Sequence, residues 1–115
     1  MFDFEKLTVY TKAKALNNKV NHFLIHTKLD RTTNDQLRRA SFSIMLNIAE
    51  GSGRFTKPDK SNFYVVSRGS SFECVAIFDY LKDIESIDEI KYDEFYNDLD
   101  ELSRMLFSLI KNLSE

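Results

Sequence analysis

Two histidines, His22 and His26, are the most direct candidates for metal chemistry in this sequence. They stand four residues apart, so on a helix their imidazole rings would lie on one side and could hold a metal ion together. Protein zinc sites use three or four ligands, and no cysteine or carboxylate cluster accompanies this pair. We therefore interpret both as surface histidines and expect the protein to bind no metal and no cofactor.

A glycine-rich segment and a lone cysteine are the next candidates. Gly51-Ser52-Gly53-Arg54 has the composition of a phosphate-binding loop, but it lacks the preceding strand and the Gly-Lys-Ser/Thr ending of such loops. Cys74 falls on an apolar stripe, where a thiol behaves as a small apolar side chain and not as a nucleophile. Neither feature predicts catalysis, and we expect no small-molecule substrate.

One carboxylate stands close to an apolar stripe and therefore needs a partner. Glu73 lies near the edge of a predicted inner face, and burying it unpaired would cost several kcal/mol. Arg39 or Arg54 could supply that partner. Because no second acid, base or nucleophile converges on Glu73, we interpret Asn47, Glu50, Arg54 and Glu73 as a structural polar network. An enzyme using Glu73 or Glu50 would instead need a deep pocket around a carboxylate with a shifted pKa.

Six basic residues are candidates for contacts with nucleic acid, because phosphate binding needs Lys and Arg gathered on one surface. They come from the first two helices and the segment that follows: Lys12, Lys19, Arg38, Arg39, Arg54 and Lys57. No helix-turn-helix and no basic strand interleaved with aromatic residues is recognisable, so base recognition has no evident carrier. A charged side of a helix is more often only a solvated surface.

Charge is divided unevenly along the chain. Residues 1–56 contain nine Lys or Arg against five Asp or Glu, whereas residues 57–115 contain seven against thirteen. The first half can offer a basic face to an anionic partner. Alternatively, the two halves attract each other within the fold or between subunits. The overall pI near 5.7 argues against strong nucleic-acid binding.

The elements that position these residues must be long. The 115 residues include 10 Phe and 5 Tyr but only 3 Gly and 1 Pro, and so few breakers allow few turns. This length fits one domain covering residues 1–115. The chain opens with an acidic, polar segment instead of a secretory signal, and it lacks the apolar run of ~18 residues that a membrane helix needs. We therefore expect a cytoplasmic protein.

Apolar spacing predicts four helices, over residues 5–28, 34–52, 58–85 and 92–113. Thr33 is the expected N-cap of the second helix, with Gln36 completing a capping box, and Pro58 fits the first turn of the third. Long helices joined by short loops favour an all-α, antiparallel up-and-down four-helix bundle.

Each predicted helix has an inner face marked by recurring apolar or small residues. In chain order the four faces are Val9, Ala13, Leu16, Val20, Phe23 and Thr27; Leu37, Ala40, Ser41, Ile44, Ile48 and Gly51; Phe63, Val66, Ser70, Cys74, Ile77, Leu81 and Ile84; and Phe95, Leu99, Leu102, Leu106, Leu109 and Leu113. Asn17, Asn18 and Asn21 fall outside the first stripe and are expected to face solvent.

The two middle helices also carry apolar residues on the side opposite their inner faces. These residues are Phe42, Met45, Leu46 and Ala49 on the second helix, and Val65, Phe72 and Ala76 on the third; the candidate contact residues are five of them, Phe42, Leu46, Val65, Phe72 and Ala76. Because such a side is normally polar in a monomeric bundle, we interpret the five residues as an oligomer interface, with self-association as the simplest case. The alternative is that loops or the long first helix cover them within the monomer.

The second and third helices resemble those of the small bundle proteins encoded by intervening sequences in bacterial 23S rRNA genes. The matching residues, in chain order, are Phe4-Glu5-Lys6-Leu7, Ala13, Leu37-Arg38-Arg39-Ala40-Ser41, Ser43-Ile44, Asn47-Ile48-Ala49-Glu50-Gly51, Gly53-Arg54, Phe63, Gly69-Ser70, Glu73 and Leu102-Ser103-Arg104-Met105-Leu106. The resemblance thus spans nearly the whole chain, and its Asn-Ile-Ala-Glu-Gly block is the most specific part.

The resemblance implies a four-helix bundle that assembles into a homopentamer and is not an enzyme. Related bundles are accessory proteins of diversity-generating retroelements, in which a strongly basic barrel binds nucleic acid and a reverse transcriptase. This sequence differs from those bundles in its low pI and its acidic last helix. We therefore expect a homo-oligomeric interaction or accessory protein, with direct RNA or DNA binding, alongside a reverse transcriptase or ribosomal RNA, as the alternative.

Overall fold

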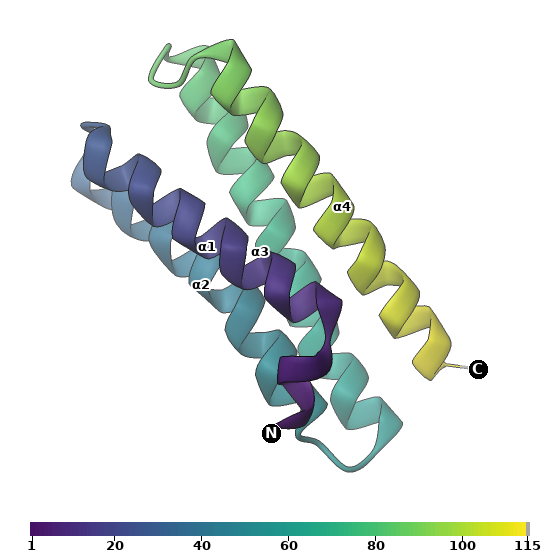
Figure 1. Ribbon diagram of the computed structural model, residues 1–115. Helices are drawn as coiled ribbons and strands as arrows, with labels where there is room; N and C mark the ends of the chain where they lie inside the picture. The colour runs from purple at the N-terminus through teal and green to yellow at the C-terminus, as the bar shows by residue number, and fades with distance from the viewer. Residues whose placement is uncertain (115) are drawn as a thin grey trace.

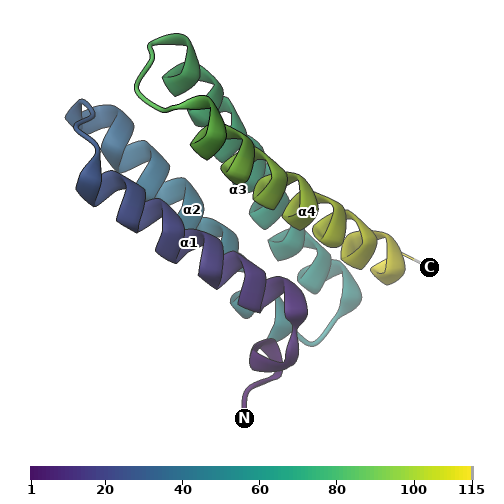
Figure 2. The same cartoon turned by 45° about the horizontal axis from the view of Figure 1, so that its top comes forward.

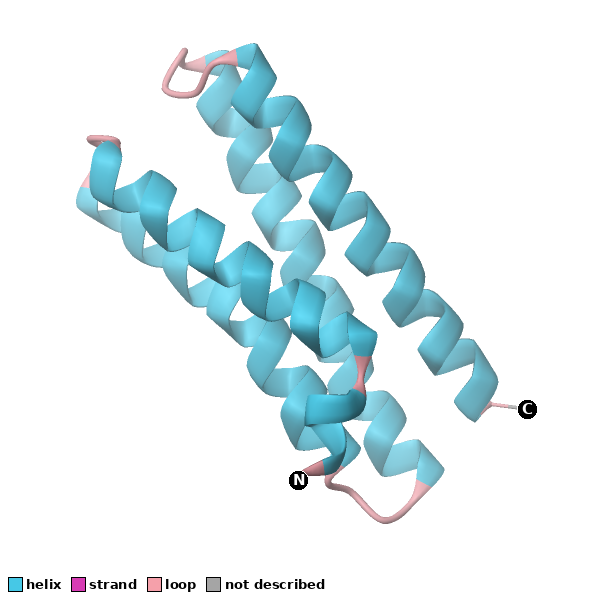
Figure 3. Ribbon diagram, viewed as in Figure 1, coloured by secondary structure: helices cyan, strands magenta, loops and turns pink. Residues whose placement is uncertain are grey.

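Four long α-helices make up most of the computed structural model, which describes residues 1–114. A short 3₁₀ helix, η1 (Asp3–Lys6), precedes α1 (Thr8–His26), α2 (Arg31–Ser52), α3 (Lys57–Asp83) and α4 (Glu89–Leu113). Consecutive helices run antiparallel and are joined by short loops (Figure 1), and no strand occurs among the described residues (Figure 3). The prediction of an all-α up-and-down four-helix bundle is confirmed.

The helices are arranged around the bundle in chain order. α2 packs against both α1 and α3, while α4 packs against α3 and, less extensively, against α1. Figure 2 shows the two hairpins, α1 with α2 and α3 with α4, facing each other. The bundle measures 43 × 25 × 21 Å, and none of the helices within residues 1–114 is long and apolar enough to cross a membrane.

The core follows the predicted inner faces on three of the four helices. On α1, α2 and α4 the fully buried positions include Ala13, Val20, Leu37, Ile44 and Leu106. At one end of the bundle, three phenylalanines from different helices form an aromatic cluster. The rings of Phe78 and Phe95 stack at 4.4 Å between centroids, and Phe23 meets both edge-on.

The predicted inner face of α3 is confirmed at Cys74 and Leu81, whereas elsewhere the buried residues lie one position after the predicted ones. The residues that α3 buries are Tyr64, Ser67, Ser71, Cys74, Phe78 and Leu81. Val66 and Ile84, which were assigned to the core, are 52% and 47% exposed, and Phe63, Ser70 and Ile77 are only half-buried. Serines occupy inner positions where α3 approaches its neighbours closely, so hydrophobic spacing alone did not show which way the helix faces.

Asn17 is buried, contrary to the expectation that all three asparagines of α1 face solvent. Its Oδ1 accepts a hydrogen bond from the Ser41 hydroxyl on α2, with 2.9 Å between the oxygens. Asn18 is exposed as expected, and Asn21 is half-buried. Because a buried amide is tolerated when its hydrogen bonds are made, Asn17 and Ser41 fix how α1 lies on α2.

The helix boundaries differ from the predicted ones mostly at the N-termini. Asp30, and not Thr33, caps α2: its carboxylate accepts hydrogen bonds from the Thr33 amide and hydroxyl, at 2.8 and 2.7 Å. These bonds lower the pKa of the Asp30 carboxyl. Asp88 caps α4 in the same way through the Lys91 amide, so both helices begin three residues before the predicted positions.

Two other boundaries depend on backbone conformation. α1 begins at Thr8 instead of Glu5 because the backbone of Leu7 is extended. This extended residue separates η1 from α1, and the ring of Phe4 in η1 packs on Tyr10 of α1.

α3 ends at Asp83 because Glu85 adopts a left-handed conformation, with φ of 58°, that a right-handed helix cannot continue. At its other end α3 begins after Thr56, whose hydroxyl accepts from the Asp59 amide.

Close packing between α2 and α3 requires a glycine at position 51. A Cβ built on Gly51 would lie 2.9 Å from both Phe63 Cβ and Tyr64 Cε1. The hydroxyl of Ser67 donates to the Ile44 carbonyl at 2.8 Å, and the hydroxyls of Ser43 and Ser70 lie 2.9 Å apart. Small side chains therefore bring these two helices together.

Replacing Gly51 with alanine should destabilise the protein. The clash should cost about 1–3 kcal/mol and outweigh a helix-propensity gain of up to about 1 kcal/mol. Guanidinium unfolding measures the difference, with Gly53→Ala as the control because its nearest neighbour would be an ordinary 3.6 Å away. A Gly51→Ala variant as stable as the wild type would show that α2 and α3 separate without cost.

Removing the Asn17 side chain should also destabilise the bundle, by about 1 kcal/mol, the usual net contribution of one hydrogen bond. The Ser41 hydroxyl would keep its second acceptor, the Arg38 carbonyl at 3.2 Å, which limits the loss. Asn18→Ala is the matched control on the exposed side of α1. A double-mutant cycle between Asn17→Ala and Ser41→Ala measures the coupling, and zero coupling would contradict this role for the bond.

Candidate oligomer interface

The outer faces of α2 and α3 carry large apolar side chains that the monomer leaves half-exposed. Phe42 and Leu46 on α2 are 48% and 45% exposed, and Val65 and Phe72 on α3 are 54% and 55% exposed. Ala76 is exposed beside them. Neither a loop nor α1 covers these five residues, which we call the outer apolar face.

Additional apolar residues on α3 enlarge this face. Val66 and Tyr80 are 52% and 49% exposed on α3, and Tyr80 lines a shallow groove together with Thr32 and Thr33 of α2. At the other edge of the face, η1 packs against α2, and Met45 is half-buried there. The outer apolar face is therefore broader on α3 than the sequence indicated, because Val66 was assigned to the core.

Gly69 lies in the middle of the outer apolar face. A Cβ built on this residue would have no heavy atom within 4 Å, so nothing inside the monomer requires a glycine here. Glycine inside a helix costs up to about 1 kcal/mol relative to alanine. A glycine at an open position surrounded by exposed apolar side chains is typical of a site that another helix approaches.

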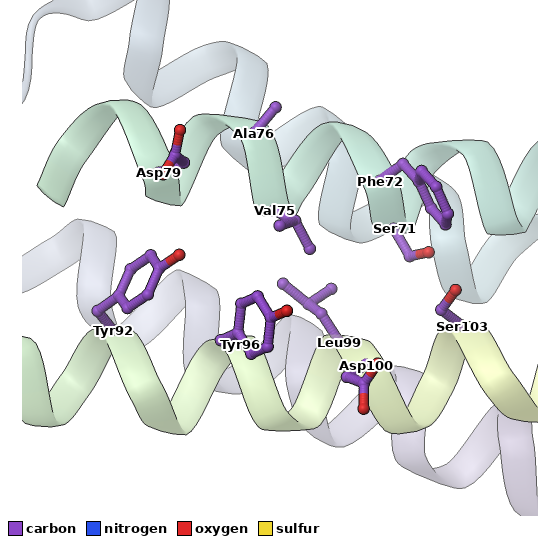
Figure 4. Close-up of a pocket in the computed structure, with 10 residues that line it drawn as sticks. All are labelled: Ser71, Phe72, Val75, Ala76, Asp79, Tyr92, Tyr96, Leu99, Asp100 and Ser103. Carbon is purple, nitrogen blue, oxygen red and sulfur yellow. The ribbon is translucent and has the colours of Figure 1, made fainter. Parts of the chain in front are cut away.

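A groove runs between α3 and α4 and meets the outer apolar face at Phe72 and Ala76. It has a volume of about 440 Å³. Figure 4 shows Val75 and Leu99 pointing toward each other across the groove, while Tyr92 and Tyr96 project from α4 toward α3. Asp79 and Asp100 add two carboxylates to its lining. The groove was not predicted from the sequence, although the two tyrosines one turn apart on α4 were a signal for it.

Arg68 closes one end of the region between α3 and α4. Its Nε donates to the Ser103 carbonyl at 3.3 Å, and its guanidinium lies 4.7 Å from the centre of the Phe72 ring. The ring of Phe107 flanks the same guanidinium at 5.5 Å. Such cation–π contacts hold Phe72 in position although half of its surface is exposed.

The four residues expected to form one polar network do not all meet. The Asn47 amide donates to the Ser43 carbonyl and hydroxyl, both at 2.9 Å, and so joins the serine pair between α2 and α3. Arg54 lies 3.6 Å from Glu50 and places its guanidinium over the Phe63 ring. Glu73 is exposed and forms no ion pair with any of residues 1–114, including the expected partners Arg39 and Arg54.

Two of the six basic candidates are paired with acids of α4. Lys19 contacts Asp98 and Glu94, each at 2.9 Å, and Lys12 contacts Glu101. Hydrogen bonds to Asp98 and then Glu94 raise the pKa of Lys19, and the same lysine lowers the pKa of Glu94. The basic first half and the acidic second half therefore attract each other within the fold, which is one of the two expected uses of the charge asymmetry.

The remaining basic candidates lie apart from that seam. Arg54 is occupied by Glu50 and Phe63, as described above. Arg38, Arg39 and Lys57 are exposed and form no ion pair within residues 1–114. The two arginines stand on α2 three and four residues before Phe42, so they flank it on the same side of the helix.

The candidate chemical groups are arranged as follows. The rings of His22 and His26 lie 4.2 Å apart on the surface, and His26 Nδ1 is bonded to the His22 carbonyl. Burial, together with the charge of Glu73, raises the pKa of the Cys74 thiol to about 12. No three His, Cys, Asp or Glu residues converge on a metal position within residues 1–114.

Comparison with known proteins places the chain in a family. The model of the 23S rRNA-intervening sequence protein family matches residues 5–108. A protein with unknown function from the S23 ribosomal protein family of Bacteroides thetaiotaomicron has the same fold in its crystal structure, with a TM-score of 0.86. The two sequences are 23% identical, and the match covers 90% of this chain and 99% of that chain. No curated protein matches the sequence. Because the family model covers nearly the whole chain, the protein belongs to the 23S rRNA-intervening sequence protein family.

Proposed function

We propose that the protein is a non-enzymatic homo-oligomer, with five subunits expected, that acts as an accessory protein beside nucleic acid. The observation that carries the proposal is the outer apolar face, in which four large side chains on adjacent helices stay 45% to 55% exposed. Large apolar side chains left exposed on adjacent helices are a feature of protein–protein contacts, and a second copy of the chain is the simplest partner.

Gly69 supports the same proposal independently of hydrophobicity. A glycine that gains nothing in the monomer has a reason to be there if a neighbouring subunit approaches its backbone. Its position between the turns that carry Val65 and Phe72 puts this close approach in the middle of the outer apolar face.

The arrangement of reactive groups supports a non-enzymatic role. Glu50 is exposed and paired with Arg54, and Glu73 lies exposed on a shallow groove together with Thr32 and Thr33. The one thiol, Cys74, is buried and has a raised pKa, so it stays protonated and unreactive at neutral pH. The accessory role is suggested by the family name, which refers to intervening sequences of 23S rRNA.

Light scattering on a sizing column should give the wild-type protein a mass near five times 13.5 kDa. Phe72→Glu should reduce the mass to that of one chain, because it removes an apolar ring from the contact and puts a hydrated carboxylate in its place. Circular dichroism should show unchanged helix content, since half of Phe72 already faces solvent.

Ile90→Glu is the matched control for this experiment. Ile90 is 83% exposed at the start of α4, away from the outer apolar face, and its replacement should leave the mass unchanged. A wild-type mass of one chain would contradict self-assembly. Loss of assembly in both variants would show only that added negative charge disperses the subunits.

Direct nucleic-acid binding is the alternative function, and the exposed pair Arg38 and Arg39 favours it. These arginines form no ion pair within residues 1–114, so an oligomer would repeat the pair in every subunit. Lys12 and Lys19 contribute less, because contact with phosphate would first break their bonds to Glu101, Glu94 and Asp98.

If the alternative holds, affinity for a short RNA should fall steeply with salt, and Arg38→Gln/Arg39→Gln should flatten that dependence. The slope should decrease by about 0.7 to 0.9 for each phosphate that the variant no longer neutralises. Fluorescence anisotropy at several salt concentrations measures both effects. Lys12→Gln is the control and should change little. No binding at about 50 mM salt would exclude direct nucleic-acid binding.

A further inference from the structure

We propose that the bundle opens along the seam between α1 and α4, with the contact between α2 and α3 as its hinge and a row of ion pairs across the seam as its latch. The opening separates the α1–α2 hairpin from the α3–α4 hairpin, which face each other in Figure 2. The inference does not rest on self-assembly, because it concerns α1 and α4, whereas the outer apolar face lies on α2 and α3.

The seam between α1 and α4 is the most loosely packed side of the bundle. Among the four pairs of neighbouring helices, α1 and α4 contact each other least. One groove also interrupts the α3–α4 side, but there the two helices contact each other far more extensively.

Three hollows follow one another along the seam, with volumes of about 350, 130 and 390 Å³. Each is lined by apolar side chains of both helices, which are, in order, Val9 with Met105, Leu16 with Leu102, and Phe23 with Phe95. Atoms that line a hollow lack packing partners on that side, so they gain less from dispersion than atoms in a filled contact. Packing therefore holds α1 to α4 weakly along the whole length of the bundle.

Hydrogen bonds between helices show the same difference. Each of the other three sides has a bond that is at least partly buried, and these bonds join Asn17 to Ser41, Ser67 to the Ile44 carbonyl, and Arg68 to the Ser103 carbonyl. Across the seam, the only side-chain hydrogen bond within residues 1–114 is the exposed one from Lys19 to Asp98. The seam is therefore the side that separates with the fewest buried polar bonds to break.

The contact between α2 and α3, on the opposite side, is suited to act as the hinge. It is the most extensive contact in the bundle, and Gly51 lets α3 approach closely there. The bond between Asn17 and Ser41 lies inside one hairpin, and the bond between Arg68 and Ser103 lies inside the other. Both bonds therefore survive when the hairpins rotate apart.

The aromatic cluster divides along the same line. Phe78 and Phe95 belong to the α3–α4 hairpin and can stay stacked, whereas Phe23 belongs to the other hairpin and meets both rings only edge-on. Opening would expose Phe23 together with Leu16 and Leu102, which are buried in the closed bundle. The open form is therefore a minor state, of the kind that local opening of a cooperative unit produces.

Three ion pairs cross the seam and form the latch. Glu94, Asp98 and Glu101 stand four and three residues apart, so they make a row on one side of α4. Lys19 lies 2.9 Å from both Glu94 and Asp98, and Lys12 contacts Glu101. These side chains are between 37% and 51% exposed, so dissolved ions screen the pairs.

Salt should act on this latch selectively. The buried hinge contacts at Gly51 and Ser67 involve uncharged groups, which salt does not screen. Raising the salt concentration should therefore favour separation of α1 from α4 and leave α2 packed against α3.

Thiol labelling measures the opening directly. In a Cys74→Ala background, Leu102→Cys places one thiol in the seam and Ser67→Cys places one in the hinge. Leu102 and Ser67 are 1% and 0% exposed, so each thiol reacts only when its site opens. After division by the rate of the unfolded variant, the seam thiol should react at least about tenfold faster than the hinge thiol. Its rate should rise about two- to fivefold between roughly 0.05 and 0.5 M NaCl.

Removing the latch should have the same effect as salt. Lys12→Gln/Lys19→Gln should accelerate labelling of Leu102→Cys about two- to fivefold at low salt and remove most of the salt dependence. Arg104→Gln is the matched control, because it removes an exposed ion pair, with Asp100, that stays within α4. Leu16→Cys, at a position 2% exposed on α1, repeats the measurement from the other helix should circular dichroism show that Leu102→Cys is unfolded.

Two results would overturn the proposal. Equal normalised rates for the seam and hinge thiols would mean that both react only through global unfolding. A seam rate that responds neither to salt nor to the two lysine substitutions would show that the ion pairs are no latch. Neither result bears on self-assembly, since labelling of these buried positions does not report contact between subunits.

Discussion

The close packing of α2 against α3 is the constraint on which the rest of the structure depends. Gly51 lets Phe63 and Tyr64 approach to a distance that no Cβ would permit, and the Ser67 hydroxyl ties α3 to the Ile44 carbonyl. These contacts fix both the level and the rotation of one helix relative to the other. The residues that remain outside are fixed as well, so the same contacts decide which apolar side chains of α2 and α3 stay exposed.

The charge asymmetry of the chain is largely used inside the fold. α1 and α4 pack least extensively among the neighbouring helices, and lysines of α1 reach across this seam to carboxylates of α4. Exposed ion pairs of this kind contribute little to stability, between 0 and about 1 kcal/mol each. Their larger effect is to occupy Lys12 and Lys19, so that of the six candidate cations Arg38, Arg39 and Lys57 are the ones without an ion pair within residues 1–114.

The sequence was sufficient to predict the bundle, because three helices have regular apolar stripes and few breakers interrupt them. It was not sufficient for α3, where Ser67 and Ser71 are buried and Val66 is exposed, so that apolar spacing indicates the wrong rotation. Asn17 was misplaced for a different reason: its partner, Ser41, lies on another helix, and no pattern within α1 predicts that bond. The large side chains predicted for the outer apolar face are exposed, whereas the groove was missed, since it depends on how α3 and α4 face each other.

A ring with an odd number of subunits places a requirement on the fold that this bundle can meet. Isologous contacts pair identical surfaces and give even numbers, so five subunits need two different surfaces on each chain. An up-and-down bundle supplies them, because α2 and α4 lie diagonally and each exposes residues that its hairpin partner does not cover. Here the outward side of α2 carries Phe42 beside two arginines, and the α3–α4 hairpin carries a largely apolar groove with carboxylates and cations beside it.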